Sequence, residues 1–351
     1  MSFHKDRVTI YDVARRAGVS PATVSRVINK RGNVRPDTEK KVLTAVKESR
    51  FSPNQIARTL PMRTSRTIGL VAESLYTPYF SRFAHELDCA CAARGYALII
   101  GLTGSDEADS RREQQVLADF VKRQVDGFVI LGGRSNFSKV STSFKRDVEE
   151  IGSQLPLVFV NCGYGFDDCS HVGTDESEAF GQVMDHLLER GHRRIALISG
   201  TAGKWTNDKK IAAYRKKMEE AGGLYSPGLI RQGIHTVESG KKSAQALLEE
   251  DRSITALACT NDILAIGALQ GVTSLGLSVP EDISVTGFDD IEPASYLTPG
   301  ITTFAQDYAA LAHESLGIIL DRAEGDTAPR HISLEGRLTL RNSTGFIRSD
   351  S

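Results

Sequence analysis

The chain has 351 residues, of which 40% are hydrophobic and 25% charged, values that are ordinary for a folded globular protein. This length is sufficient for a substantial core and for more than one domain. The sequence shows neither a signal peptide nor an apolar run long enough to span a membrane, and its five scattered cysteines favour reduced thiols, so we expect a cytoplasmic protein.

The net charge of −1 hides an uneven distribution of charged residues. Residues 1–66 contain 15 Lys and Arg but only 5 Asp and Glu, whereas residues 67–351 contain 28 basic and 39 acidic residues. A small basic segment joined to an acidic body is typical of a phosphate-binding module linked to a separate domain. A basic patch can also be an ordinary solvent-exposed face. The sequence pattern within residues 1–66 has to distinguish this interpretation from a phosphate-binding module.

The stretch from Thr9 to Asn29 predicts two short helices separated by a tight turn. Apolar residues recur at helical spacing on both sides of the turn at 18–20. We expect Thr9 to cap the first helix, and Ser20, followed by Pro21, to cap the second. Two helices joined by a glycine-containing turn are typical of a helix-turn-helix, whose second helix enters the DNA major groove. An ordinary helical hairpin is the alternative.

Two further segments complete the N-terminal part. A third helix is predicted from about Pro36 to Ser49, followed by a two-turn helical segment from Asn54 to Leu60. The second segment is too short to be stable alone in water, because isolated helices of under about 12 residues are marginal, so we expect a partner to order it. We therefore divide the chain into a headpiece (1–52), a hinge and linker (53–66) and a core (67–351).

Beyond Ile68, short apolar runs alternate with amphipathic helical segments. The predicted strands are Ile68–Ala72, Ala97–Gly101, Gly127–Leu131, Leu157–Asn161, Ile195–Ser199, Ala256–Cys259 and Ile283–Phe288. Helices are predicted near 79–94, 110–124, 139–152, 176–190, 208–221, 238–250, 261–275 and 307–323. Alternating strands and helices predict parallel sheets covered on both faces, and the length favours two such subdomains with a cleft between them.

Polar residues follow several of these strands, where open α/β sheets bind their ligands. Asn161, Asn261 and Asp289 each stand at the end of a predicted strand, and Tyr79 and Phe80 lie shortly after the first one. Amides, carboxylates and aromatic faces that converge on a cleft suit a polyhydroxylated ligand. The alternative is that these residues cap the helices that follow, as we expect of Asp262 and of either Asp290 or Glu292.

The motifs of several enzyme classes are missing from the sequence. No G-x-G-x-x-G follows the first strand, and the glycine-lysine segment at 200–205 lacks the spacing of a phosphate loop. No His and Cys cluster has zinc spacing, and there is no G-x-S-x-G motif. We therefore expect no enzyme activity, no cofactor and no metal site.

The chain resembles the lactose/galactose-repressor (LacI/GalR) family of bacterial transcription regulators over essentially its whole length. The most specific segments are V-T-I-Y-D-V-A-R-R-A-G-V-S-P-A-T-V-S-R-V-I-N and P-N-Q-I-A-R-T-L; the later segments G-H-R-R-I-A-L-I-S-G, A-C-T-N-D-I-L-A-I-G-A-L and P-E-D-I-S-V-T-G-F-D-D-I-E also match. The resemblance implies an all-α helix-turn-helix headpiece and a periplasmic-binding-protein-like α/β core of two doubly wound parallel-sheet subdomains. It also implies a homodimer that binds a pseudo-palindromic operator in double-stranded DNA.

The family pattern also implies roles for individual headpiece residues. Arg26 is expected to read a guanine, because arginine can donate two hydrogen bonds to its O6 and N7 atoms. Leu60 matches the leucine that the family inserts into the minor groove to kink the duplex. The full set of implied DNA-binding residues is Tyr11, Ser20, Pro21, Ala22, Thr23, Ser25, Arg26, Asn29, Asn54 and Leu60.

In the core, the resemblance implies a small-molecule effector, expected to be a sugar or sugar derivative, and a repressor of carbohydrate or related catabolic genes. The implied effector-binding residues are Tyr79, Phe80, Asn161, Lys210, Asn261 and Asp289. Lys210 stands where many members have an arginine, and a lysine cannot make the planar, two-pronged contact of a guanidinium. Two alternatives remain: a core that responds mainly to a protein co-regulator, and a solute-binding protein without a DNA role, against which the basic headpiece argues.

Overall fold

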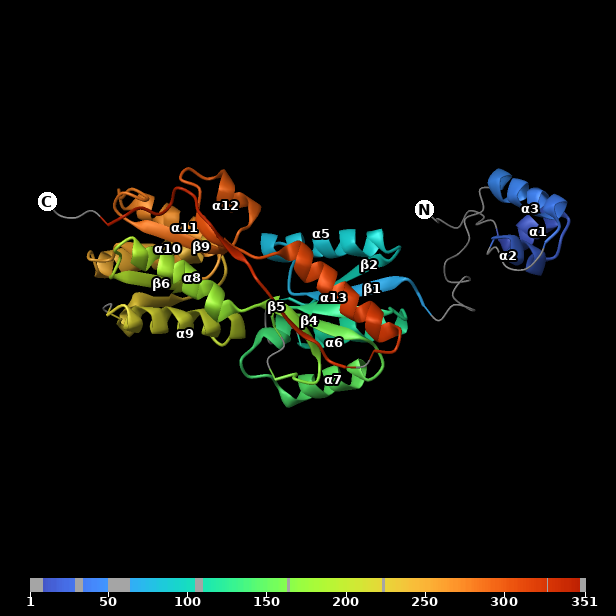
Figure 1. Cartoon of the computed structure of the whole chain (residues 1–351), viewed down its shortest axis with the longest axis horizontal. Helices are drawn as coiled ribbons and strands as arrows, with labels where there is room; N and C mark the ends of the chain where they lie inside the picture. The colour runs from blue at the N-terminus through green and yellow to red at the C-terminus, as the bar shows by residue number, and fades with distance from the viewer. Residues whose placement is uncertain are drawn as a thin grey trace. The chain divides into compact units, whose positions relative to one another are not determined.

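The computed structural model describes residues 9–28, 34–49, 64–104, 110–162, 165–222, 225–326 and 328–347. The chain divides into two compact units, residues 1–65 and residues 66–351. Among the residues singled out above, Asn29, Asn54 and Leu60 lie outside the described ranges. Figure 1 shows both units and labels many of their helices and strands.

The first unit contains three helices, α1 (Ile10–Ala17), α2 (Pro21–Ile28) and α3 (Pro36–Glu48). The Thr9 hydroxyl accepts a hydrogen bond from the backbone N–H of Asp12, and the Asp12 carboxylate accepts one from the N–H of Thr9, which completes a capping box. Ser20 Oγ accepts from the N–H of Thr23 at 3.1 Å, and Pro21 occupies the first position of α2. Both predicted caps are confirmed, and each contributes about 1 kcal/mol.

The turn between α1 and α2 depends on Gly18. Its φ of 67° is left-handed, a conformation that glycine adopts without the steric penalty of a Cβ. The turn brings the apolar faces of the helices together around a small core. The buried residues of this core are Val13, Ala14, Val24, Val27, Val42 and Ala45. Polar residues of α1 and α2 consequently remain on the surface.

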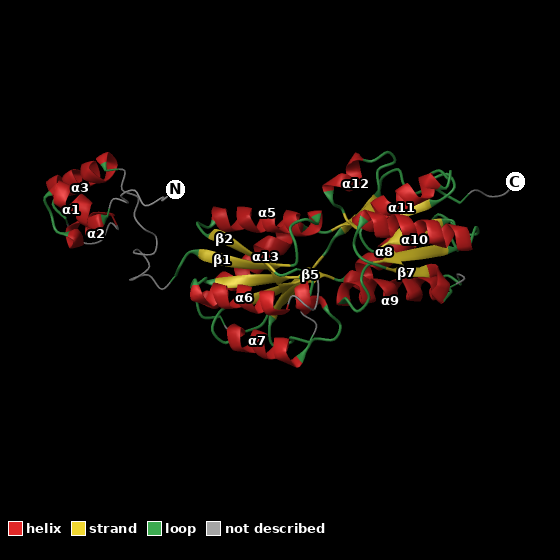
Figure 2. Cartoon of the chain, turned by 180° about the vertical axis from the view of Figure 1, so that it is seen from behind, coloured by secondary structure: helices red, strands yellow, loops and turns green. Residues whose placement is uncertain are grey.

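The second unit contains two six-stranded sheets, each with helices on both faces (Figure 2). The first sheet has the order β11-β5-β4-β3-β1-β2 and the second β12-β10-β9-β8-β6-β7. The first sheet consists of β1 (Thr67–Ala72), β2 (Ala97–Leu102), β3 (Gly127–Leu131), β4 (Leu157–Val160), β5 (Ser170–Thr174) and β11 (His331–Leu334). The second consists of β6 (Ile195–Ser199), β7 (Ile230–Gln232), β8 (Ala256–Cys259), β9 (Ser284–Asp289), β10 (Thr302–Ala305) and β12 (Arg337–Thr339).

The helices pack on the sheets through four apolar clusters, because the central strands are buried on both faces. On the first sheet, α5 (Pro78–Ala93) and α13 (Tyr308–Ala323) cover one face, and α6 (Ser110–Lys122) and α7 (Thr142–Gly152) the other. On the second, α10 (Val237–Glu250) and α11 (Asp262–Ser274) lie opposite α8 (Glu176–Glu189) and α9 (Trp205–Glu220). Three short helices, η2 (Gly133–Asn136), η3 (Pro227–Leu229) and α12 (Glu292–Tyr296), lie in connections.

The two sheets with their helices form two interleaved lobes. Lobe 1 comprises residues 66–174 and 308–334, and lobe 2 comprises residues 176–305 and 337–347. The chain therefore passes between them three times, after β5, β10 and β11. In Figure 1, the late helix α13 accordingly lies in the same lobe as the early helix α5. This interleaving couples the lobes through three adjacent connections.

The strict alternation of strand and helix predicted from the sequence is incomplete. Among the described residues, no helix separates β4 from β5, and β12 runs antiparallel to β10 whereas the other paired strands are parallel. The patterns do not predict β5, β7, β10, β11 or β12, because these strands are short and lack a continuous apolar run. Cys162 and Cys169, which stand close enough in sequence to pair, are both free thiols.

Candidate functional site

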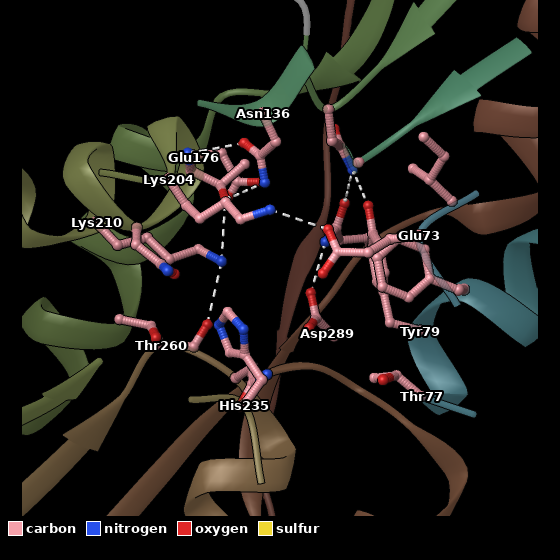
Figure 3. Close-up of a pocket in the computed structure, with 18 residues that line it drawn as sticks. Glu73, Thr77, Tyr79, Asn136, Glu176, Lys204, Lys210, His235, Thr260 and Asp289 are labelled. Carbon is pink, nitrogen blue, oxygen red and sulfur yellow. Dashed lines mark hydrogen bonds and ion pairs between the residues drawn. The ribbon is translucent and has the colours of Figure 1, made fainter. Parts of the chain in front are cut away.

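A pocket lies between the two lobes of the core, at the carboxyl ends of the strands (Figure 3). Its empty volume, part of which is open solvent, is about 730 Å³. It is lined by Glu73, Thr77, Tyr79, Phe80, Leu131, Gly132, Asn136, Asn161, Glu176, Lys204, Thr206, Asn207, Lys210, His235, Thr260, Asn261, Asp289 and Gln306. All six residues predicted to contact an effector are among them.

The strand ends place several of these side chains. Asn161 directly follows β4, Asn261 follows β8 by two residues, and Asp289 is the last residue of β9. Asn161 and Asp289 have φ values of 49° and 99°, which are uncommon for residues with a side chain. Backbone strain of this kind persists only where the surroundings hold it, and it is frequent at functional sites.

A chain of hydrogen bonds connects the two lobes at the base of the pocket. Asn161 Nδ2 donates to Tyr79 Oη at 2.9 Å and to Gln306 Oε1 at 2.7 Å, while Asn161 Oδ1 accepts from the backbone N–H of Thr174. Gln306 Nε2 in turn donates to Asp289 Oδ1 at 2.7 Å. Asn161 is therefore held by protein groups, and the second oxygen of Asp289 accepts no hydrogen bond from the described residues.

Lys210 forms a buried ion pair on the lobe 2 side. Its Nζ lies 2.9 Å from Glu176 Oε2 and donates to the backbone oxygen of Thr260 at 3.1 Å. The ammonium also lies 3.7 Å from the centre of the Phe288 ring. Burial raises the pKa of Glu176 and of Asp289, although the nearby Lys210 charge opposes the change in both carboxyls.

A second ion pair crosses the pocket from one lobe to the other. Lys204 Nζ, at the start of α9, lies 3.0 Å from Glu73 Oε2, just after β1, and the two side chains point toward one another in Figure 3. The backbone N–H of Gly133 donates to the same Glu73 oxygen. Beside this pair, Asn136 Nδ2 donates to Thr206 Oγ1 at 3.2 Å and Asn136 Oδ1 accepts from the N–H of Thr206. One ion pair and two hydrogen bonds between neutral groups thus join the two lobes across the pocket.

His235 reaches the pocket from the loop between β7 and α10. A Cβ on Gly200 would lie 1.9 Å from His235 Nε2, so only glycine at position 200 leaves room for this ring orientation. Burial, with Lys210 and Lys204 nearby, lowers the pKa of His235 to about 4. Its ring is therefore neutral at pH 7 and offers one hydrogen-bond donor and one acceptor.

The sequence patterns did not identify several residues of this pocket. Lys204 and Gly200 belong to the segment that lacks a phosphate loop's spacing, yet this segment starts α9 and supplies a pocket lysine. Glu176 and His235 show no local signal, since their roles come from neighbours distant in sequence. The rule that ligand-binding polar residues follow the ends of strands identifies neither of them.

Two capping predictions need correction. Asn261, not Asp262, caps α11, because its Oδ1 accepts from the backbone N–H of Leu264. Asp262 is fully buried and accepts hydrogen bonds from Thr303 Oγ1 and from the N–H of Ile291.

The start of α12 also differs from the prediction. Neither Asp290 nor Glu292 caps this helix, whose N-cap is Ile291. Asp290 instead accepts a hydrogen bond from Arg341 at 2.6 Å.

The predicted DNA-binding residues that the structure describes lie together on α1 and α2. Tyr11 is 66% exposed, and Ser20, Ala22 and Arg26 are exposed as well. Pro21, Thr23 and Ser25 are half-buried. The hydroxyls of Ser20 and Thr23 are 2.9 Å apart at the start of α2. Arg26 lies one turn further along the helix than Ala22, so both side chains project from a similar face.

The described part of the chain gives no support for a membrane-spanning helix or for a metal site. None of its helices has the length and apolar character required to cross a membrane. Within the same residues, no group of three or more His, Cys, Asp or Glu side chains is arranged to hold a metal ion.

Comparisons with known proteins match both units. The sequence model of one protein family, bacterial regulatory proteins of the lacI family, matches residues 9–54. The sequence model of a second family, the periplasmic binding protein-like domain, matches residues 184–344. The HTH-type transcriptional repressor PurR of Haemophilus influenzae (strain PittEE) is 34% identical over 344 residues, which are 97% of this chain and 99% of that protein. PurR of Erwinia tasmaniensis is 35% identical over 315 residues, which are 90% of each chain.

Solved structures agree with these matches. A lac repressor dimer bound to operator and the anti-inducer ONPF is similar with a TM-score of 0.87 and 26% identity, covering 97% of this chain and 100% of that one. The transcriptional regulator CelR in complex with cellobiose has a TM-score of 0.71 and 29% identity, covering 96% and 100%. The chain therefore belongs to the lacI family of bacterial regulatory proteins and is a DNA-binding transcriptional repressor, not an enzyme.

Proposed function

We propose that this repressor binds a pseudo-palindromic operator as a homodimer, and that a sugar or sugar derivative in the pocket between the lobes changes its operator affinity. The observation that carries the proposal is the pocket lining, to which both lobes contribute hydrogen-bonding groups. A ligand that contacts both lobes favours one arrangement of them over the other. Such a ligand can therefore act as a switch.

The headpiece supports operator binding by α1 and α2. The exposed Arg26 is assigned to a guanine, and Pro21 and Ala22 to shape and apolar contact with bases. Tyr11, Ser20, Thr23 and Ser25 are assigned to phosphates, which fix the register on the duplex. Asn29, Asn54 and Leu60 complete the proposed interface from outside the described residues. We retain headpiece 1–52, hinge 53–66 and core 67–351 as the proposed division, acting in the cytoplasm where the DNA is.

The pocket chemistry supports a polyhydroxylated effector. Asn261 uses its Oδ1 to cap α11, and no described residue accepts a hydrogen bond from its Nδ2. Asp289 accepts from Gln306 through Oδ1, and its Oδ2 has no hydrogen bond within the described chain. Together with the ring nitrogens of His235, these groups offer the mixture of donors and acceptors that hydroxyl groups require. The rings of Tyr79 and Phe80 supply apolar surface beside them.

The proposal is tested by a thermal-shift screen of the full-length protein against sugars and sugar derivatives. Any sugar that binds is then added to an operator-binding titration. The DNA for this titration is taken from upstream of the genes that neighbour the repressor gene. We expect at least one sugar to raise the unfolding temperature and to alter operator affinity. If no sugar changes the unfolding temperature or the operator affinity, the sugar assignment is refuted. The assignment of the chain as a DNA-binding repressor would still stand.

A further inference from the structure

Both lysines that line the pocket are already neutralised by a carboxylate. Lys204 pairs with Glu73 at 3.0 Å and Lys210 with Glu176 at 2.9 Å. The side chains of the two lysines are only 5% and 6% exposed, so each charge depends on its partner and not on water. Neither ammonium is available as an unpaired cation for a ligand.

The remaining contacts of these lysines strengthen this arrangement. Lys204 Nζ also approaches the backbone oxygen of Gly133 and lies 4.3 Å from the centre of the Phe137 ring. Lys210 donates to the backbone oxygen of Thr260 and faces the Phe288 ring. Each ammonium is thus enclosed by acceptors and aromatic faces that the protein itself supplies.

The pocket also holds a third carboxyl group without a cation of its own. Asp289 forms no ion pair within the described chain, and its Oδ1 accepts from the neutral amide of Gln306. Lys210, the cation that acts on Asp289 electrostatically, is shared with Glu176. With three carboxyl groups against two ammonium groups, the lining has no excess of positive charge.

We propose, on the basis of the sugar effector proposed above, that the pocket selects an uncharged sugar and excludes sugar acids and sugar phosphates, with Glu73 as the determining residue. An anionic ligand would enter a site in which the described residues offer no unpaired cation, and its charge would stay partly buried without a partner, which is strongly unfavourable. An uncharged sugar needs only hydrogen-bond donors and acceptors, which Asn261, Asp289 and His235 offer. Glu73 is decisive because it occupies the cation, Lys204, that reaches across from the other lobe.

The test measures binding of matched neutral and acidic sugars to the full-length protein by isothermal titration calorimetry at pH 7. The pairs are D-glucose with D-glucuronate, D-galactose with D-galacturonate, and cellobiose with cellobionate. We expect one neutral sugar to bind and its acid to bind at least about 100-fold more weakly, because the carboxylate would be buried unpaired. An acid that binds as tightly as its neutral partner, or more tightly, would overturn the inference without any variant.

A variant then assigns the selectivity to Glu73. Glu73→Gln keeps the shape of the side chain but leaves Lys204 without an anionic partner, so we expect the affinity for the acid relative to that for the neutral sugar to rise at least about tenfold. Glu238→Gln makes the same chemical change in an exposed pair with Lys242 and should leave both affinities unchanged. Equal effects of the two variants on acid binding would contradict the role of Glu73.

The outcomes separate this inference from the function on which it rests. If neither the neutral sugars nor the acids bind, the proposed sugar effector fails, and the selectivity proposed for it fails as well. If acids bind and change operator affinity, the sugar-responsive function stands and only the exclusion of charged ligands is wrong. If neutral sugars bind and acids do not, both are supported.

Discussion

Lys210 Nζ lies 2.9 Å from Glu176 Oε2, with the two side chains only 6% and 3% exposed, so this ion pair is part of the core of lobe 2 as well as of its pocket. Glu176 begins α8 and Lys210 lies in the second turn of α9, so the pair joins two helices on the same face of the sheet. Buried charges of this kind are costly to separate, because either one alone lacks both water and a partner.

Removing one member of this pair should therefore be worse than removing both. We expect Lys210→Met or Glu176→Gln alone to lower the free energy of unfolding by about 3 kcal/mol, because each leaves a polar or charged group buried without its partner. The double variant should lose less than either single variant, because it leaves neither group buried without its partner. Urea unfolding of all four proteins measures the coupling, and strictly additive losses would show that the two groups do not interact.

The recognition helix gives a prediction about sequence discrimination. Replacing Arg26 with alanine should weaken operator binding by about 1–3 kcal/mol and relax discrimination at one base pair, because a bidentate contact to guanine is lost. Lys41→Ala removes the same charge from α3 and serves as the control, with a loss that is uniform across operator variants. Fluorescence anisotropy with a set of single-base operator variants distinguishes the two. An unchanged base preference in the Arg26 variant would disprove the assignment.

Gly200 and His235 give a prediction about the pocket. Gly200→Ala places a methyl group 1.9 Å from the present position of His235 Nε2, so the ring must move. We expect effector affinity to fall by about tenfold or more, since a displaced pocket side chain loses its contacts with the ligand. Gly317→Ala in α13 meets no neighbour within 4 Å and should leave effector affinity unchanged. Calorimetry on both variants compares them, and equal affinities would exclude His235 from the binding surface.

The pH dependence of stability should depend on His186. Arg190 donates to its Nδ1 at 3.0 Å, so this nitrogen must act as an acceptor and the ring is neutral, while Nε2 donates to Thr344 Oγ1 at 2.9 Å. Burial, and then the Arg190 charge, lower the pKa of His186 to about 4. The unfolded chain therefore binds a proton at a higher pH than the folded one, and stability falls as pH decreases from about 6.5 towards 4.

Urea unfolding at a series of pH values tests this behaviour. We expect His186→Gln to remove about 2 kcal/mol of the loss between pH 6.5 and 4, because one proton fewer is taken up on unfolding. His313→Gln, at an exposed position, should follow the wild-type profile. A His186 variant whose stability profile runs parallel to that of the wild type would show that another group controls the acid sensitivity.

Much of the fold could be predicted because its signals are local. The caps at Thr9 and Ser20, the turn at Gly18 and the apolar strands buried on both faces each follow from a few neighbouring residues. The edge strands β7, β11 and β12 could not be predicted in this way. Their residues are ordered by pairing with strands already in the sheet, so their own sequences carry little information.

The pocket shows the same limit. Asn161, Asn261 and Asp289 could be predicted because they end strands that are themselves predictable, and strand ends in parallel sheets converge. Lys204 and Glu73 could not be paired in advance, because 131 positions separate them in the chain and the contact exists only when the lobes meet. The rule that polar residues after strands cap helices also failed to separate Asn261 from Asp262, since both stand at the same strand end.

The central claim is that a ligand in the pocket of the core controls the affinity of the headpiece for DNA. Its most direct test is an anisotropy titration of operator DNA with the full-length repressor, with and without a saturating sugar identified by calorimetry, using the wild type and Asp289→Ala. We predict that the sugar changes wild-type operator affinity by at least about fivefold, the lower range of allosteric coupling, and leaves that of Asp289→Ala unchanged. A sugar that binds in the pocket but leaves wild-type operator affinity unaltered would contradict the account.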